Sequence, residues 1–280
     1  MSEKDLSASM NVRIMGDGED TIVLSHGYGA DQSVWQKTAP ALSKHFRVFL
    51  FDWCFSGSVM ESNLYDPDKH SSYEAFADDL NLLLDENGLS STIFIGHSMS
   101  GMIGCIASVK RPDLFKRLVL LGASPRYQNM DGYEGGFASE QIEEMMLNLE
   151  MNYDGWASFF ANLVVGSNDP PSVNVFLSCL LRMNHDVALP MAKTVFYCDQ
   201  REFLHRVTTP CTIIQVSNDI VVPNSVAYLM HDRIAGKSTV EMIDTDGHFP
   251  QLTAHEQLMD VLGGVLGFVP DHRVADLAGP

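Results

Sequence analysis

Basic residues are scarce in this sequence, and its few cysteines follow no recognisable pattern. Lys and Arg total 18 against 36 Asp and Glu, so the formal net charge is −18. Phosphate backbones and anionic bilayers repel such a chain, and we expect neither nucleic-acid nor membrane binding. The five cysteines are far apart and lack the spacing of a disulfide framework or of a Cys/His zinc site. We therefore expect a reducing compartment and no metal.

Long apolar runs are also absent. No stretch of about 18 apolar residues occurs that could cross a membrane. The first ten residues, MSEKDLSASM, are polar and acidic and lack the apolar segment of a secretion signal. Hydrophobic residues make up 45% and charged residues 19%, which excludes a disordered or fibrous chain. We expect a soluble, intracellular protein with one core domain and an insertion, because 280 residues suffice for one large core.

Short β-rich runs alternate with helical patterns in two parts of the chain, residues 1–124 and 195–270. This alternation is typical of βαβ units around a mostly parallel sheet. Residues 73–87 form the clearest helical pattern, with an apolar stripe and Gly88 as a plausible stop. The predicted strands are residues 21–25, 47–52, 92–95, 117–121, 211–216 and 239–243.

The strand pattern stops between residues 125 and 194, where Gly and Pro breaks separate several helical stretches. We predict an inserted helical lid there. One of its helices should follow Ser139 as N-cap, with an apolar face and an acidic face. The first ten residues and the tail, 271–280, lack periodicity and are expected to be mobile.

The segment TIFIGHSMSGMIG, residues 92–104, has the pattern of a buried strand that turns abruptly into a helix of small residues. Such a turn lifts the Ser98 hydroxyl above the sheet and directs the first helix amides at the same space, where they can stabilise an oxyanion. Gly96 and Ser100 are the small neighbours that a tight turn needs, although Ser100 replaces the usual glycine of GxSxG. An ordinary strand-to-helix turn is the alternative.

A second oxyanion donor is expected from the loop after the first predicted strand, which reads His26-Gly27-Tyr28-Gly29. The backbone N–H groups of Tyr28 and Met99 are the predicted pair. A plain β-to-α turn is the alternative for this short motif.

Two later loops, each beyond a strand end, carry an acid and a base in the order Ser, Asp, His. We predict that His248 takes the Ser98 proton and later protonates the leaving group, while Asp219 orients the imidazole. Asp244 and Asp246 are rivals, but they share the turn of His248 and could hardly reach the far side of its ring. Nine other histidines are expected to be surface or packing residues, with His97 in a structural or pocket-wall role.

These motifs predict an α/β-hydrolase fold, and the chain closely resembles the plant karrikin and strigolactone receptor hydrolases. It resembles more distantly their bacterial relative that activates a stress sigma factor. The resemblance covers residues 11–268. It is carried by GYGADQSVW (27–35), GHSMSGMIG (96–104), RPDLF (111–115), ASPRY (123–127), GGF (135–137), Asp219 and GHFP (247–250).

The resemblance implies a butenolide ligand that the serine attacks at its lactone ring, opens slowly and leaves partly attached to the enzyme, with no cofactor. It also implies a monomer of the cytoplasm and nucleus, whose ligand-bound lid docks an F-box adaptor of a ubiquitin ligase and a transcriptional co-repressor. The implied pocket wall consists of Tyr28, His97, Tyr127, Phe137, Met145, Trp156, Phe160, Phe176, Phe196, Ile220 and Phe249.

Some residues depart from the pattern of these receptors. Tyr28 stands where a phenylalanine is usual, and the loop DWCFSGS, residues 52–58, is bulkier than usual. Residues 57–59 are strigolactone-type while other parts are karrikin-type, so the ligand preference stays open. Residues 131–155 contain seven acidic side chains and no Lys or Arg, which could attract a basic partner or could be a solvated helix face.

Two alternatives to a receptor remain. One is an ordinary small-ester or lactone esterase without a signalling partner. The other is a catalytically silent interaction protein, and the intact set of Ser98, Asp219 and His248 argues against it.

Overall fold

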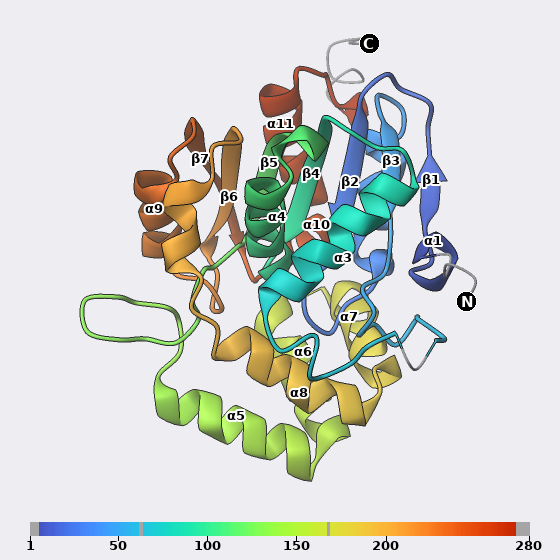
Figure 1. Cartoon of the computed structure of the whole chain (residues 1–280). Helices are drawn as coiled ribbons and strands as arrows, with labels where there is room; N and C mark the ends of the chain where they lie inside the picture. The colour runs from blue at the N-terminus through green and yellow to red at the C-terminus, as the bar shows by residue number, and fades with distance from the viewer. Residues whose placement is uncertain (1–5, 62–63, 167–168, 273–280) are drawn as a thin grey trace, which may run out of the picture.

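A central β-sheet with helices on both faces forms the body of the protein (Figure 1). The computed structural model describes residues 6–61, 64–166 and 169–272. In that part of the chain, seven strands lie in the order β1-β3-β2-β4-β5-β6-β7. Only β1 is antiparallel to its neighbour, so the predicted mostly parallel α/β sheet is confirmed. The strands are β1 (Arg13–Met15), β2 (Thr21–Ser25), β3 (Arg47–Leu50), β4 (Thr92–His97), β5 (Phe115–Leu121), β6 (Cys211–Asn218) and β7 (Ser238–Asp246).

The strand boundaries differ from the prediction at several ends. Strand β1 was not predicted, because three mostly exposed residues show no apolar alternation. Residues 51 and 52 do not continue β3, whereas β6 and β7 extend further than predicted and pair as far as Asn218 with Asp246. These extensions carry polar residues, among them Ser217, Asn218 and Asp246, which are partly or fully exposed.

The helices of the core pack against both faces of the sheet. In Figure 1, α3 and α4 lie in front of the strands and α11 behind them. The apolar stripe predicted for residues 73–87 is buried along α3, which ends at Glu86. The helices of this part are α1 (Leu6–Ser9), α2 (Ala39–Leu42), α3 (Tyr73–Glu86), α4 (Met99–Lys110), α9 (Asn224–Arg233), α10 (Pro250–Thr253) and α11 (His255–Leu266), with 3-10 turns η1 (Gln32–Trp35), η2 (Pro112–Leu114) and η3 (Arg201–Arg206).

The two ends of the chain were expected to be mobile. Residues 1–5 and 273–280 lie outside the described residues. Residues 6–10 are held in place, contrary to that expectation, because the Glu86 carboxylate accepts from the N–H groups of Leu6 and Ser7. The side chain of Met10 is buried in the core.

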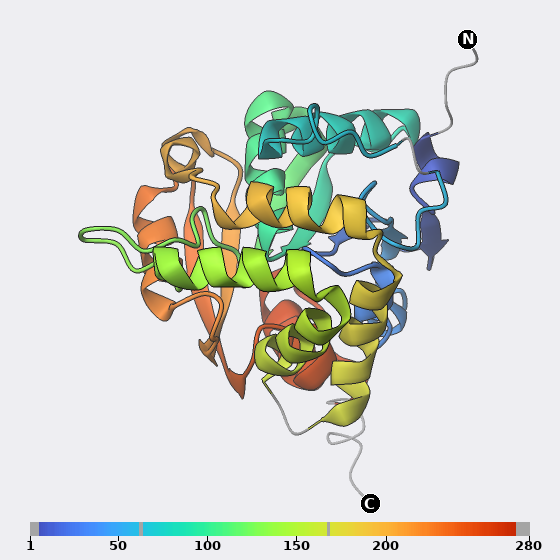
Figure 2. The same cartoon turned by 90° about the horizontal axis from the view of Figure 1, so that it is seen from below.

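Residues 125–194 contain most of a helical layer that lies at the carboxyl ends of the parallel strands. Figure 2 shows its helices crossing that end of the molecule. They are α5 (Ser139–Met151), α6 (Tyr153–Val165), α7 (Pro170–Arg182) and α8 (His185–Phe196). We call these helices the lid.

The start of α5 lies one residue from its predicted place. Ala138 is the N-cap residue, and its N–H donates to the Gln141 side chain at 2.8 Å. Ser139 is the first helical residue, and its hydroxyl accepts from the Gln128 side chain instead of capping the helix. The predicted apolar face does pack, since Ile142, Met146 and Leu149 are buried.

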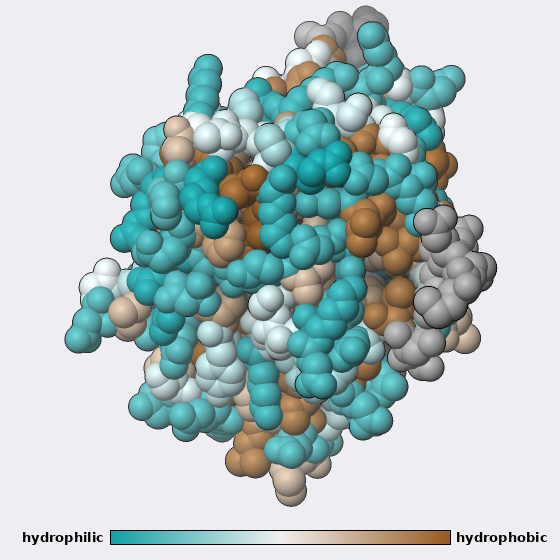
Figure 3. Space-filling model, in the orientation of Figure 1, coloured by the Kyte–Doolittle hydropathy of each residue, from teal (hydrophilic) through white to brown (hydrophobic). Residues whose placement is uncertain are grey.

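The face of the molecule seen in Figure 3 is mainly hydrophilic. In Figure 3, apolar residues occur on this face as small separate patches. Among the described residues, no helix is both long and apolar enough to cross a membrane. All five cysteines are free thiols.

Candidate active site

Ser98 lies at the sharp turn between β4 and α4. Its backbone has φ 58° and ψ −126°, a conformation that non-glycine residues rarely adopt and that stores strain. Gly96 permits this turn, because a Cβ there would lie 2.6 Å from the Ser100 carbonyl oxygen and 2.7 Å from the Gly101 nitrogen. The turn therefore presents the serine hydroxyl at the carboxyl edge of the sheet.

Ser100 joins this turn to the loop after β2. Its hydroxyl donates to the His26 carbonyl at 2.5 Å and accepts from the Trp53 indole N–H at 2.9 Å. The two loops are in close contact, since a Cβ on Gly27 would lie 3.0 Å from Ser98 Cβ. Serine in place of the usual glycine thus adds a hydrogen bond that holds the loop of residues 26–29 against the turn.

Three side chains that are distant in the sequence meet above this edge of the sheet. His248 Nε2 lies 2.9 Å from Ser98 Oγ, and His248 Nδ1 lies 2.7 Å from Asp219 Oδ2. The Asp219 side chain is fully buried, and its other oxygen accepts from the N–H groups of Val221 and Val222. An ionised Asp219 fixes the proton on Nδ1, which leaves Nε2 free to accept the serine proton. The structure thus brings together the three residues that the sequence analysis selected.

The main chain of His248 is held on two sides. Its N–H donates to the Val164 carbonyl of α6 at 2.7 Å, and its carbonyl accepts from His97 Nε2 at 2.7 Å. Burial lowers the pKa of His97 well below its ordinary value, so His97 is a neutral donor. Gly247 allows the close approach of α6, because a Cβ there would lie 1.8 Å from the Val165 carbonyl oxygen.

The two predicted oxyanion donors lie on either side of Ser98. Among the described residues, the N–H groups of Tyr28 and Met99 have no hydrogen-bond acceptor. Met99 begins α4, whose dipole adds positive potential at this position. Both amides are therefore available to a substrate oxygen.

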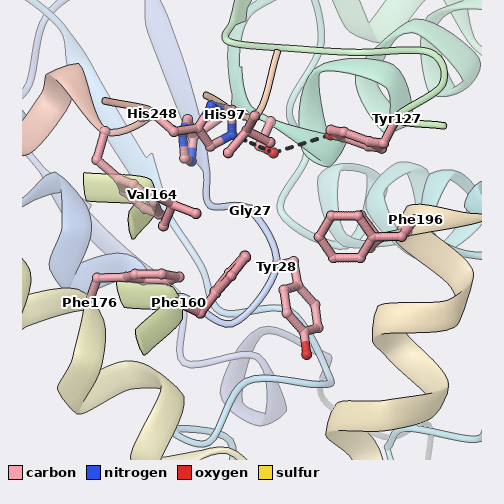
Figure 4. Close-up of a pocket in the computed structure, with 13 residues that line it drawn as sticks. Gly27, Tyr28, His97, Tyr127, Phe160, Val164, Phe176, Phe196 and His248 are labelled. Carbon is pink, nitrogen blue, oxygen red and sulfur yellow. Dashed lines mark hydrogen bonds between the residues drawn. The ribbon is translucent and has the colours of Figure 1, made fainter. Parts of the chain in front are cut away.

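An apolar cavity lies beside Ser98, and residues of the lid form part of its wall (Figure 4). The space open to the centre of a water-sized sphere is about 30 Å³. Seven predicted wall residues line it, namely Tyr28, His97, Tyr127, Phe160, Phe176, Phe196 and Phe249, together with Gly27, Ser98, His248 and three valines that were not predicted, Val164, Val195 and Val221.

Four predicted wall residues lie outside this cavity. Phe137, Met145 and Trp156 line a separate hollow between α5 and α6, because Phe160 stacks on Trp156 at 4.9 Å and lies between the two spaces. Ile220 is half exposed, since the turn that buries the Asp219 carboxylate directs the next side chain to solvent. No sequence pattern separates these four residues from those that line the cavity. For Met145 and Trp156, the rotation of the helix about its own axis decides which side chains face the cavity.

Two tyrosines of the wall have different partners. The Tyr127 hydroxyl lies 3.2 Å from Ser98 Oγ, and burial raises its pKa, so it is a neutral phenol. The Tyr28 hydroxyl points away from the cavity in Figure 4 and donates to the Ala188 carbonyl of α8 at 3.1 Å. The extra hydroxyl at position 28 therefore ties the core to the lid.

The chain is similar to known proteins in both sequence and structure. The family model described as "alpha/beta hydrolase fold" matches residues 20–254. The karrikin insensitive 2 receptor IA of Petunia hybrida is 44% identical over 92% of this chain and 94% of its own. The strigolactone esterase D14 of Arabidopsis thaliana is 39% identical over 94% of this chain and 98% of its own.

Among solved structures, a hydrolase from Oleispira antarctica superposes with a TM-score of 0.90 at 30% identity, covering 94% of this chain and 97% of that one. The resemblance inferred from the sequence motifs is confirmed. The chain belongs to the α/β-hydrolase family, within the group that contains the karrikin and strigolactone receptor hydrolases.

Proposed function

We propose that this protein is a serine hydrolase-type receptor that binds a small butenolide, of the kind for which its relatives are named, and hydrolyses it slowly. The arrangement of Ser98, His248 and Asp219 under an apolar, lid-covered cavity carries this proposal. Relatives named as esterases and as receptors support both parts of it.

The reaction begins when Ser98 Oγ attacks the lactone carbonyl and His248 Nε2 takes the serine proton. The amides of Tyr28 and Met99 stabilise the oxyanion. The carbon–oxygen bond of the ring then breaks, and His248 gives the proton to the departing oxygen. Water, deprotonated by His248, attacks the acyl-enzyme, and Ser98 leaves and is reprotonated. Asp219 stabilises the charged imidazole in both halves of the reaction.

The wall of the cavity connects a bound ligand to the lid. Phe160 and Phe196 belong to lid helices and form much of this wall, so a bound ring contacts the lid directly. Ligand binding is then coupled to the conformation of the lid, and the lid is the surface that a partner could recognise.

For partners, we propose an F-box adaptor of a ubiquitin ligase and a transcriptional co-repressor, with action in the cytoplasm and nucleus as a monomer. The outer face of α5 supports recognition of a basic surface, because its carboxylates are exposed. These residues are Glu140, Glu143, Glu144 and Glu150.

Intact-mass spectrometry with a panel of butenolides tests the proposal. The wild-type protein should gain the mass of a ligand fragment, and its melting temperature should shift with the same ligand. Ser98→Ala should keep the fold but gain no mass and hydrolyse no ester, because the acyl bond needs this hydroxyl. Full ester turnover by Ser98→Ala would refute the catalytic assignment. Rapid multiple turnover of simple esters without any ligand-induced shift would instead identify an ordinary small-ester or lactone esterase.

A further inference from the structure

A second cluster of polar side chains lies away from the cavity, where the loop after β3 packs on α3. Cys54 Sγ is 3.6 Å from His70 Nε2, and His70 Nε2 is 2.8 Å from Asp79 Oδ2. All three residues are buried, with 6%, 0% and 8% of their surface exposed. The sulfur, nitrogen and oxygen atoms lie within 4.8 Å of one another.

The spacing of these atoms is close to that of a tetrahedral zinc site. With Zn–S of about 2.3 Å and Zn–N and Zn–O of about 2.1 Å, tetrahedral angles place S and N about 3.6 Å apart and N and O about 3.4 Å apart. The Cys54 sulfur and the His70 nitrogen are already 3.6 Å apart. The carboxylate oxygen must move away from the nitrogen by roughly 0.6 Å, from 2.8 Å, which a rotation of the Asp79 side chain can supply.

The other nitrogen of His70 has the surroundings of a metal-bound histidine. His70 Nδ1 lies 3.0 Å from the Asp66 carbonyl oxygen and 3.1 Å from the Asp66 nitrogen. When Nε2 carries the proton, Nδ1 accepts from the Asp66 N–H. When Nε2 binds a metal, Nδ1 carries the proton and donates to the Asp66 carbonyl, as most metal-bound histidines donate to an oxygen. The same turn therefore supports both tautomers.

We propose that Cys54, His70 and Asp79 form a binding site for a thiophilic divalent cation such as Zn²⁺, with water as the fourth ligand. Thiolate, imidazole and carboxylate are all zinc ligands, and three protein ligands with one open position are a common arrangement. The Cys54 thiol loses its proton to solvent when the sulfur–metal bond forms.

The charges around the cluster are compatible with a bound cation. Lys69 occupies only the other oxygen of Asp79, at 2.6 Å, and is half exposed, so it can turn toward solvent. Two anionic ligands then balance the two charges of the metal.

Tyr65 completes the enclosure of the cluster. Its ring stacks on the His70 ring with centroids 5.3 Å apart, and its buried hydroxyl has no hydrogen-bond partner among the described residues. Burial and, secondly, the nearby Cys54 raise the pKa of this hydroxyl to about 12. A neutral, unpaired hydroxyl beside the cluster is a suitable partner for a metal-bound water.

The cluster lies under the lid, so a bound cation would affect the residues that support a lid helix. The Thr194 hydroxyl of α8 lies 3.3 Å from the His70 carbonyl oxygen and 3.2 Å from the Pro190 carbonyl oxygen of its own helix, and its hydrogen can be donated to either of them. A metal at this position would join the loop after β3 to α3 directly beneath α8. It would thus stiffen the platform on which that lid helix rests.

Titration of the chelator-treated protein with Co²⁺ tests the proposal, because cobalt replaces zinc in such sites and absorbs in the near ultraviolet when bound to thiolate. We expect this absorption to saturate at one Co²⁺ per chain and to disappear on addition of Zn²⁺. Zn²⁺ should also raise the melting temperature of the wild-type protein. Cys54→Ser should lose the thiolate absorption, and Asp79→Asn should bind at least tenfold more weakly.

Cys179→Ser is the matched control, because it removes another buried thiol whose contact with the Val175 carbonyl a serine hydroxyl can keep. It should titrate like the wild type. Circular dichroism checks that each variant is folded. Absence of thiolate absorption in the wild-type protein overturns the proposal without any variant. Absorption that persists in folded Cys54→Ser, or that is lost in folded Cys179→Ser, overturns it as well.

Discussion

Gly247→Ala tests whether close contact with the lid positions the catalytic histidine. Gly247 has φ +86°, and a Cβ there would lie 1.8 Å from the Val165 carbonyl oxygen. Real Cβ atoms essentially never approach closer than 3.0 Å, so α6 and the turn of His248 must separate by about 1.2 Å. This separation stretches the hydrogen bond from the His248 N–H to Val164 and moves the imidazole away from Ser98. Misplacement by about 1 Å can cost about 100-fold in rate, and we expect kcat/KM for a chromogenic ester to fall by about that factor.

Gly267→Ala is the control for backbone strain alone. Gly267 has a similar φ of +81°, but a Cβ there would meet nothing within 4 Å. Gly267→Ala should lose about 1–2 kcal/mol of unfolding free energy, because alanine is strained at positive φ. Gly247→Ala should lose more, because the clash with the Val165 carbonyl adds to the same strain. Only Gly247→Ala should lose activity, measured well below its melting temperature. If Gly247→Ala retained kcat/KM within about threefold of the wild type, the reasoning would be refuted.

Three further predictions concern the site. Asp219→Asn should lower kcat by about 10⁴-fold while the protein stays folded, because an amide favours the wrong histidine tautomer; a loss of less than tenfold in ester turnover would contradict the triad. Tyr28→Phe should lower the unfolding free energy by about 0.5–1.5 kcal/mol in urea titrations, since the hydrogen bond to Ala188 is lost; unchanged stability would contradict a tie between core and lid. Burial lowers the pKa of His97 in the folded protein, so below about pH 6.5 this residue binds a proton in the unfolded chain but not in the folded protein. The unfolding free energy should therefore fall as the pH drops, and His97 should contribute up to about 1.4 kcal/mol per pH unit to this fall. His97→Gln should flatten that slope, and parallel pH profiles of the two proteins would exclude the assignment.

The central part of the fold and of the site could be predicted because its signals are local. The turn around Ser98 needs small residues at fixed offsets. Asp219 follows directly on the buried strand β6, and His248 comes two residues after the end of β7. The parallel sheet then brings its carboxyl ends together, so three separate local patterns meet at one place.

Other features depend on packing that the sequence does not encode locally. Val164 and Val195 line the cavity while Trp156 does not, because the rotation of α6 and α8 decides which side faces inward. Strand β1 is too short and exposed to show a period. Cys54, His70 and Asp79 have no ligand-like spacing, and only the fold of the loop after β3 brings them together.

The hydrogen bond from the His248 N–H to the Val164 carbonyl connects the chemistry to the lid, which forms part of the cavity wall. The N–H of His248 depends on the last turn of α6, whereas its side chain must point at Ser98. A displacement of α6 therefore withdraws the proton acceptor at the same time as it opens the cavity. Hydrolysis can proceed only while that helix is seated, and an acylated serine would persist for as long as the helix stays displaced.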